Sequence, residues 1–158
     1  LPDPFPLELY GKSVLLSHGD ALCTDDTEYQ QMRAMTRNPE WQAMMLAKPL
    51  EERIAIAKQA RARSQERNKT LSESIMDVNP DAVEQVISEY GVEILLHGHT
   101  HRPGIHNVEA DDRITKRVVL GDWYDQGSVV RWDEDGVDLS PIARQASPSG
   151  TGTADPAL

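Results

Sequence analysis

Short apolar runs separated by turn residues predict the strands of this chain. The runs 7–10 and 13–17 flank Gly11-Lys12, an arrangement typical of a β-hairpin. The largely apolar run 92–96 predicts a buried strand, because polar residues do not alternate regularly along it. Further extended segments are predicted over 105–107, 117–120, 127–132 and 137–139.

Two helices are predicted between the hairpin and the middle of the chain. Segment 29–47 is helical by composition and is interrupted at Asn38-Pro39, and a second helix is predicted over 50–69. Thr24 or Asp25 is expected to cap the first helix, because acidic residues are favoured near a helix amino terminus.

A third helix is predicted over 80–90. Asn79 is its expected cap, proline suits its first position, and Gly91 is its expected stop. One face of this helix is apolar at Val83, Val86 and Ile87. Followed by the strand 92–96, it forms an α/β unit, which predicts a layered α/β sandwich.

The length of 158 residues suits one domain, which we expect to span 1–146. The segment 147–158 has no apolar periodicity and is expected to be disordered. Large apolar residues crowd the helical segment 27–70, and many have no polar face opposite them. That segment is expected either to cover an apolar ligand or to pack in an ordinary core, and the pattern leaves both possibilities open.

Histidines follow two of the predicted strands. His18 begins the sequence His18-Gly19-Asp20, and a later loop contains His97, His99 and His101 around Gly98. Neutral imidazole is the commonest protein metal ligand, and glycine permits close approach of the backbone. This arrangement predicts a metal site at the strand ends.

The net charge of −10 argues against general binding to nucleic acid, which needs a basic surface. A single cysteine, Cys23, excludes an internal disulfide and is expected to be a small buried loop residue. No apolar run approaches the roughly 18 residues that span a bilayer. The chain does not begin with methionine, so we expect that it does not start where the gene product starts.

Basic residues concentrate in the second helix of this acidic chain. Arg61, Ser64 and Asn68 are spaced by three and four residues, so they share one helical face. A guanidinium, a hydroxyl and an amide on one stripe suit a phosphate or a sugar. The alternative is a solvated charged face, and the spacing favours the ligand-binding interpretation.

The motifs together resemble the calcineurin-like metallophosphoesterases. A strand ending in His-Gly-Asp and a later Gly-His-Thr-His match the last two metal-binding motifs of that superfamily. The sequences Leu-Cys-Thr-Asp-Asp, Ile-Met-Asp-Val-Asn and Val-Val-Leu-Gly-Asp-Trp make residues 7–139 similar to the UDP-2,3-diacylglucosamine diphosphatases of lipid A synthesis. This resemblance implies the carboxyl-terminal part of a four-layer αββα sandwich, with the helical segment 27–70 as an insertion over the lipid.

The resemblance also implies roles for individual residues. His18, His99 and His101 match metal ligands, and no further catalytic residue is implied. Substrate contacts are implied for Asp26, Arg61, Ser64, Asn68 and His99. Leu71 stands where the family usually has a lysine, and Lys69 is the candidate replacement.

The implied activity is hydrolysis of the pyrophosphate bond of UDP-2,3-diacylglucosamine. Two Mn²⁺ ions would activate a hydroxide that attacks the α-phosphorus, which gives UMP and 2,3-diacylglucosamine 1-phosphate. Such a substrate lies in a membrane, so the resemblance implies a peripheral enzyme on the cytoplasmic face of the bacterial inner membrane.

The chain departs from the family by the absence of its leading motifs. Asp-X-His, Gly-Asp and Gly-Asn-X-Asp do not precede His18 here. We therefore expect a carboxyl-terminal part that hydrolyses little alone. Two alternatives stay open: a related phosphodiesterase that acts on nucleotides, and a non-catalytic module or half of a split enzyme. An Asp-X-His in frame upstream of Leu1 would exclude the second alternative.

Overall fold

A five-stranded sheet forms the centre of the computed structural model, which describes residues 1–72, 75–123 and 126–143, without the side chains of Asn68 and Gln126. Its strands have the order β1-β2-β3-β5-β4. They are β1 (Phe5–Leu9), β2 (Lys12–Ser17), β3 (Ile94–His97), β4 (Gly104–Ala110) and β5 (Arg113–Val119). A second sheet pairs β6 (Gln126–Asp133) with β7 (Gly136–Ala143).

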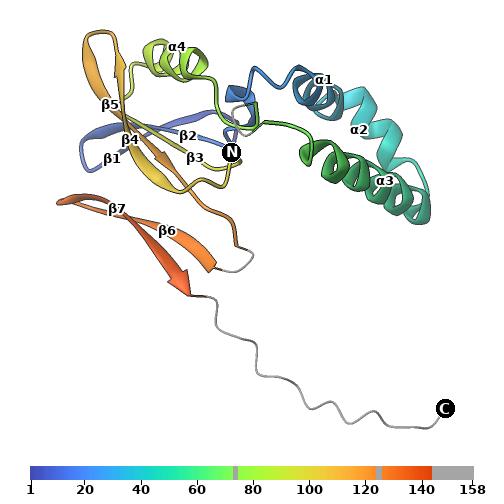
Figure 1. Cartoon of the computed structure of the whole chain (residues 1–158). Helices are drawn as coiled ribbons and strands as arrows, with labels where there is room; N and C mark the ends of the chain where they lie inside the picture. The colour runs from blue at the N-terminus through green and yellow to red at the C-terminus, as the bar shows by residue number, and fades with distance from the viewer. Residues whose placement is uncertain (73–74, 124–125, 144–158) are drawn as a thin grey trace, which may run out of the picture.

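The two sheets and one helix make three layers (Figure 1). Helix α4 (Pro80–Tyr90) covers one face of the large sheet, and β6 and β7 lie against the other. This confirms a mixed α/β fold. The four-layer arrangement and the domain limits 1–146 stay predictions, and the predicted disorder over 147–158 falls outside the described residues.

Three helices project to one side of these layers (Figure 1). After a 3₁₀ turn at Asp20–Leu22 come α1 (Thr27–Thr36), α2 (Pro39–Leu46) and α3 (Leu50–Asn68). The predicted break at Asn38-Pro39 is confirmed, because Asn38 caps α2 by accepting hydrogen bonds from the amides of Glu40 and Trp41. Neither α1 nor α2 contains a buried residue. These helices are therefore not part of the core.

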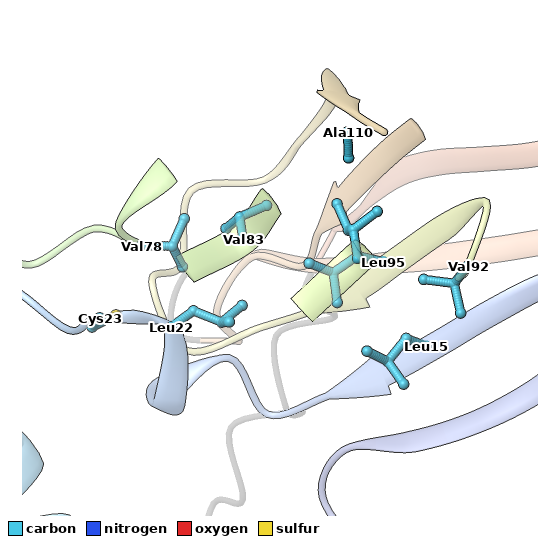
Figure 2. Packing of buried hydrophobic residues seen from close by; sticks show 9 residues of the cluster. Leu15, Leu22, Cys23, Val78, Val83, Val92, Leu95 and Ala110 are labelled. Carbon is cyan, nitrogen blue, oxygen red and sulfur yellow. The ribbon is translucent and has the colours of Figure 1, made fainter. Parts of the chain in front are cut away.

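The larger core cluster lies between the sheet and α4 (Figure 2). Leu15 and Leu95 from neighbouring strands are fully buried there against Ile87 of α4. Asn79 caps α4 through the amide of Ala82, and Gly91 ends the helix in the left-handed conformation, as the sequence predicts. The apolar stripe of α4 is thereby fixed on the sheet.

The opposite face of the sheet is covered by the β6–β7 hairpin. Val14, Ile94 and Val118 are buried on this face. Val130 and Trp132 of β6 pack against them. Because β2 and β3 run parallel and are covered on both faces, the middle of β2 and nearly all of β3 are continuously apolar rather than alternating, whereas β5 is buried and apolar at its end, Val118 and Val119.

Replacing Leu95 with alanine tests this description of the core. Leu95 is fully buried in the larger cluster, so Leu95→Ala should lower the free energy of unfolding by about 2–5 kcal/mol. Ile114→Ala is the matched control, because Ile114 is 77% exposed, and it should change stability by no more than about 0.5 kcal/mol. Urea unfolding followed by circular dichroism measures both, and equal losses would contradict the core assignment.

Candidate functional site

The two histidine loops meet because their strands are neighbours in parallel. Ser17 of β2 is in register with His97 of β3, so both strands end at the same edge of the sheet. The amide of Gly98 donates a hydrogen bond of 3.2 Å to the carbonyl of His18. Gly19 has φ of 99°, and a Cβ there would lie 2.7 Å from Nδ1 of His97. Only glycine allows the loops to lie this close.

This contact brings His18 and His99 together. Their ring centroids are 5.0 Å apart, and His99 lines the same cavity as His101. His99 and His101 have φ of 66° and 56°, a left-handed backbone that is uncommon for residues other than glycine. Such conformations concentrate at functional sites, where the surrounding structure holds them.

The environment of His99 favours the neutral form of its imidazole. Burial lowers the pKa of His99, and the neighbouring His18 lowers it further. A neutral imidazole retains the lone pair that a metal ion needs. Within the part of the chain that the structure describes, no group of three or more histidine, cysteine, aspartate or glutamate side chains is arranged to hold a metal ion by itself.

His97 differs from the other histidines of its loop. Its side chain is buried, and Nδ1 lies 2.9 Å from the carbonyl oxygen of Gly98. Nε2 lies 3.3 Å from the guanidinium of Arg117 on β5. Burial lowers the pKa of His97 to about 4, so this ring is neutral. His97 thus belongs to the core and shapes the loop.

Asp20 forms a buried charge cluster beside His18, which the sequence analysis did not single out. One oxygen, Oδ2, accepts bonds of 2.8 Å from Arg33 and from Arg37, and one of 3.4 Å from the hydroxyl of Tyr29. The other, Oδ1, lies 3.1 Å from Nδ1 of His18. Burial alone would raise the pKa of Asp20, but His18 and the two arginines outweigh it and lower the pKa.

A cavity of about 830 Å³ opens from the histidine loop toward the helices. Its lining includes large apolar side chains, which are those of Met32, Met35, Ile56, Ile75 and Met76. Asp26, Ser64, His99 and His101 also line the cavity, so the structure gathers these four predicted site residues around one space. His18 is not among the lining residues, although its ring lies beside His99.

The face of α3 that lines the cavity is rotated from the predicted stripe. Ser64 lies on it, together with Arg63 and Arg67. Arg61 is exposed and does not line the cavity. Asn68 is the last residue of α3, and its side chain lies outside the described part of the structure. Arg63 and Arg67 were not among the predicted site residues, although their spacing from Ala60 of three and seven residues indicates the correct face.

Asp26 has two partners that fix its carboxylate. It caps α1 by accepting a 2.9 Å bond from the amide of Tyr29, so the expected caps Thr24 and Asp25 were wrong. Arg67 donates to both of its oxygens, at 2.9 Å to Oδ2. The hydrogen bond from Arg67 is the main reason that the pKa of Asp26 is lowered, against the opposing effect of burial.

Glu28 extends this ion pair across the two helices. It accepts bonds from Arg63 at 2.9 Å and from Arg67 at 3.0 Å. The amino terminus of α1 and the last turns of α3 are thereby joined by charges rather than by buried apolar contacts.

Comparison with curated proteins identifies close relatives. The chain is 53% identical over 150 residues to "UDP-2,3-diacylglucosamine hydrolase" of Xanthomonas oryzae pv. oryzae, a match that covers 90% of this chain. Identity is 52% to the protein of that name from Xanthomonas axonopodis pv. citri, and 49% over 152 residues to that of Stenotrophomonas maltophilia. The chain spans 61% of the length of these relatives. A search of protein-family models finds no match.

The reactivity of Cys23 tests the burial of this loop. Burial raises the pKa of the Cys23 thiol to about 11, and the thiolate is the reactive form. At pH 8 we expect an aromatic disulfide reagent to modify Cys23 at least about 100-fold more slowly in the folded protein than in urea-unfolded protein. The absorbance of the coloured thiolate that the reagent releases measures both rates. Equal rates in the two states would show that the loop is open.

Removing Arg67 tests the connection between α1 and α3. Arg67→Gln leaves the buried Asp26 carboxylate without its guanidinium and should destabilise the protein by about 1–3 kcal/mol. Arg63→Gln is the matched control, because Arg63 is 80% exposed at its side chain, and it should cost less than about 1 kcal/mol. In a double-mutant cycle Arg67→Gln should couple to Asp26→Asn, and additive effects would exclude a direct interaction.

Proposed function

This chain is a homologue of the UDP-2,3-diacylglucosamine hydrolases, and from that premise we propose that the whole protein hydrolyses UDP-2,3-diacylglucosamine. Water adds at the α-phosphorus and the bond from that phosphorus to the bridging oxygen breaks. The products are UMP and 2,3-diacylglucosamine 1-phosphate. The reaction belongs to lipid A biosynthesis.

The observation that carries this proposal is the mixed character of the cavity. His99 and His101 line it together with large apolar side chains, among them Met32 and Met35 of α1. A substrate with a diphosphate joined to acyl chains needs these two environments side by side. A water-soluble nucleotide needs only the first, so the geometry favours the lipid substrate over the nucleotide alternative.

We assign the polar head of the substrate to polar residues that line the same cavity. Ser64 has a hydroxyl at the cavity and Asp26 a carboxylate, and each suits a sugar hydroxyl or amide group. His99 lies where it can meet a phosphate oxygen. Arg61 and Asn68 remain proposed contacts from the same helix, on the basis of family resemblance. Lys69 forms an ion pair with Glu66 at 2.7 Å, and we retain it as the candidate for the cation absent at Leu71.

Two divalent metal ions, proposed as Mn²⁺, complete the site. His18, His99 and His101 would hold them, and their imidazole nitrogens are suitable donors. When bound, the ions supply activation of water and neutralisation of phosphate charge. The lowered pKa of His99 keeps its ring available as a ligand, and the remaining ligands are expected from outside the described residues. On this account the 158-residue chain alone should release little UMP.

The helices beyond the cavity suit the surface of a membrane. Met44 and Leu46 of α2 and Leu50 and Ile54 of α3 are exposed. No helix in the described part of the chain is long and apolar enough to cross a bilayer. We propose peripheral contact of these side chains with the cytoplasmic face of the inner membrane, where the substrate would enter the cavity.

Release of UMP by the whole protein tests the proposal. With Mn²⁺ and UDP-2,3-diacylglucosamine in mixed micelles, we expect UMP to appear, as measured by liquid chromatography. His99→Ala should lower the rate at least about 100-fold, since it removes a proposed ligand. His106→Ala is the matched control, because this exposed histidine of β4 is not part of the cavity, and it should stay within about twofold. Faster turnover of a water-soluble diester would contradict the lipid substrate.

A further inference from the structure

We propose that Asp20 is a positioning residue, which sets the orientation of the His18 ring and holds helix α1 against the histidine loop. The inference rests on the proposed function in one respect, namely that His18 is a metal ligand. Asp20 itself is 2% exposed and lies at the start of the 3₁₀ turn that follows His18-Gly19. It therefore acts on solutes only through its neighbours.

The two oxygens of Asp20 serve different parts of the structure. Among the described residues, Oδ2 accepts hydrogen bonds from groups of α1 and its carboxyl-terminal cap, which are Tyr29, Arg33 and Arg37. Oδ1 faces His18. A single buried carboxylate thus connects the first helix of the cavity wall to a strand-end histidine.

Oδ1 determines which nitrogen of His18 carries a proton. This oxygen is buried and makes no well-aligned hydrogen bond among the described residues, while Nδ1 of His18 lies 3.1 Å away. An ionised carboxylate only accepts, so Nδ1 must be the donor. The His18 side chain is 54% exposed, so its ring has room to turn toward this oxygen. Nε2 is then left with its lone pair, and a hydrogen bond from the far ring nitrogen is the usual support of a metal-ligating histidine.

Helix α1 reaches the second histidine as well. The ring of Tyr29 lies 5.1 Å from that of His99, and Tyr29 donates its hydroxyl to Asp20. The same helix supplies Met32 and Met35 to the lining of the cavity. Through Asp20, the position of helix α1 and the orientation of the His18 ring are therefore set together. A residue that served only general stability would need no contact with His18.

Nitrogen NMR of the whole protein without metal tests the orientation directly. At pH 8.5 the unsubstituted protein should show His18 protonated at Nδ1. Protonation at Nε2 would overturn the proposal without any variant. In Asp20→Asn, whose amide both donates and accepts, we expect a mixture of the two tautomers.

Two further readouts separate positioning from a merely structural role. Asp20→Asn should weaken Mn²⁺ binding about 10–100-fold by calorimetry, and amide exchange in α1 should quicken at least about tenfold. Arg37→Gln removes one donor to Oδ2 of Asp20, so it should quicken amide exchange in α1 and leave the His18 tautomer unchanged. Asp81→Asn removes an exposed carboxylate of α4 and is the matched control. It should leave the His18 tautomer, the Mn²⁺ affinity and the amide exchange of α1 unchanged.

The outcomes distinguish this inference from the proposed function. If the unsubstituted protein binds no Mn²⁺ or releases no UMP, the proposed function fails, while the tautomer and exchange measurements still decide the role of Asp20. If it binds Mn²⁺ and Asp20→Asn binds it equally well with unchanged exchange, the positioning role fails alone. Should Asp20→Asn not fold, the tautomer of the unsubstituted protein and the Arg37→Gln exchange carry the test.

Discussion

The parallel pairing of β2 with β3 is the constraint on which the candidate site depends. It aligns Ser17 with His97, so the two strands end at the same edge of the sheet. Gly19 then allows the loops to touch, and His18 comes to lie beside His99. A shift of this register would separate the rings, because both loops depend on where their strands end.

The helical segment is attached to this edge mainly by charges. Neither α1 nor α2 buries a residue, yet α1 is held by buried Asp20 and joined to α3 through Asp26 and Arg67. Ion pairs between partly buried groups resist screening better than exposed ones. They leave the apolar side chains of the segment free to line a cavity and to face outward. The arrangement suits a cover that must meet a lipid rather than fill a core.

Much of the fold could be predicted because its signals are local. Asn79 and Gly91 bound α4, Asn38-Pro39 separates α1 from α2, and glycine at position 11 marks the hairpin. Each of these helix ends and turns is determined by hydrogen bonding and backbone conformation within a few residues of sequence. The cap of α1 could not be predicted in this way, because the local signal was ambiguous. Three neighbouring residues offered capping oxygens, and only the direction of entry into the helix selected Asp26.

The sequence by itself determined the types of residue available for chemistry and the strand ends that carry them. The resemblance of its motifs to a known family assigned metal binding to His99 and His101 and not to His97. Tertiary structure alone decided which side chains meet. Arg67 reaches Asp26 across 41 residues of sequence, and Asp20 gathers Arg33 and Arg37 at its second oxygen. These contacts depend on the rotation and angle of whole helices, which no local pattern encodes.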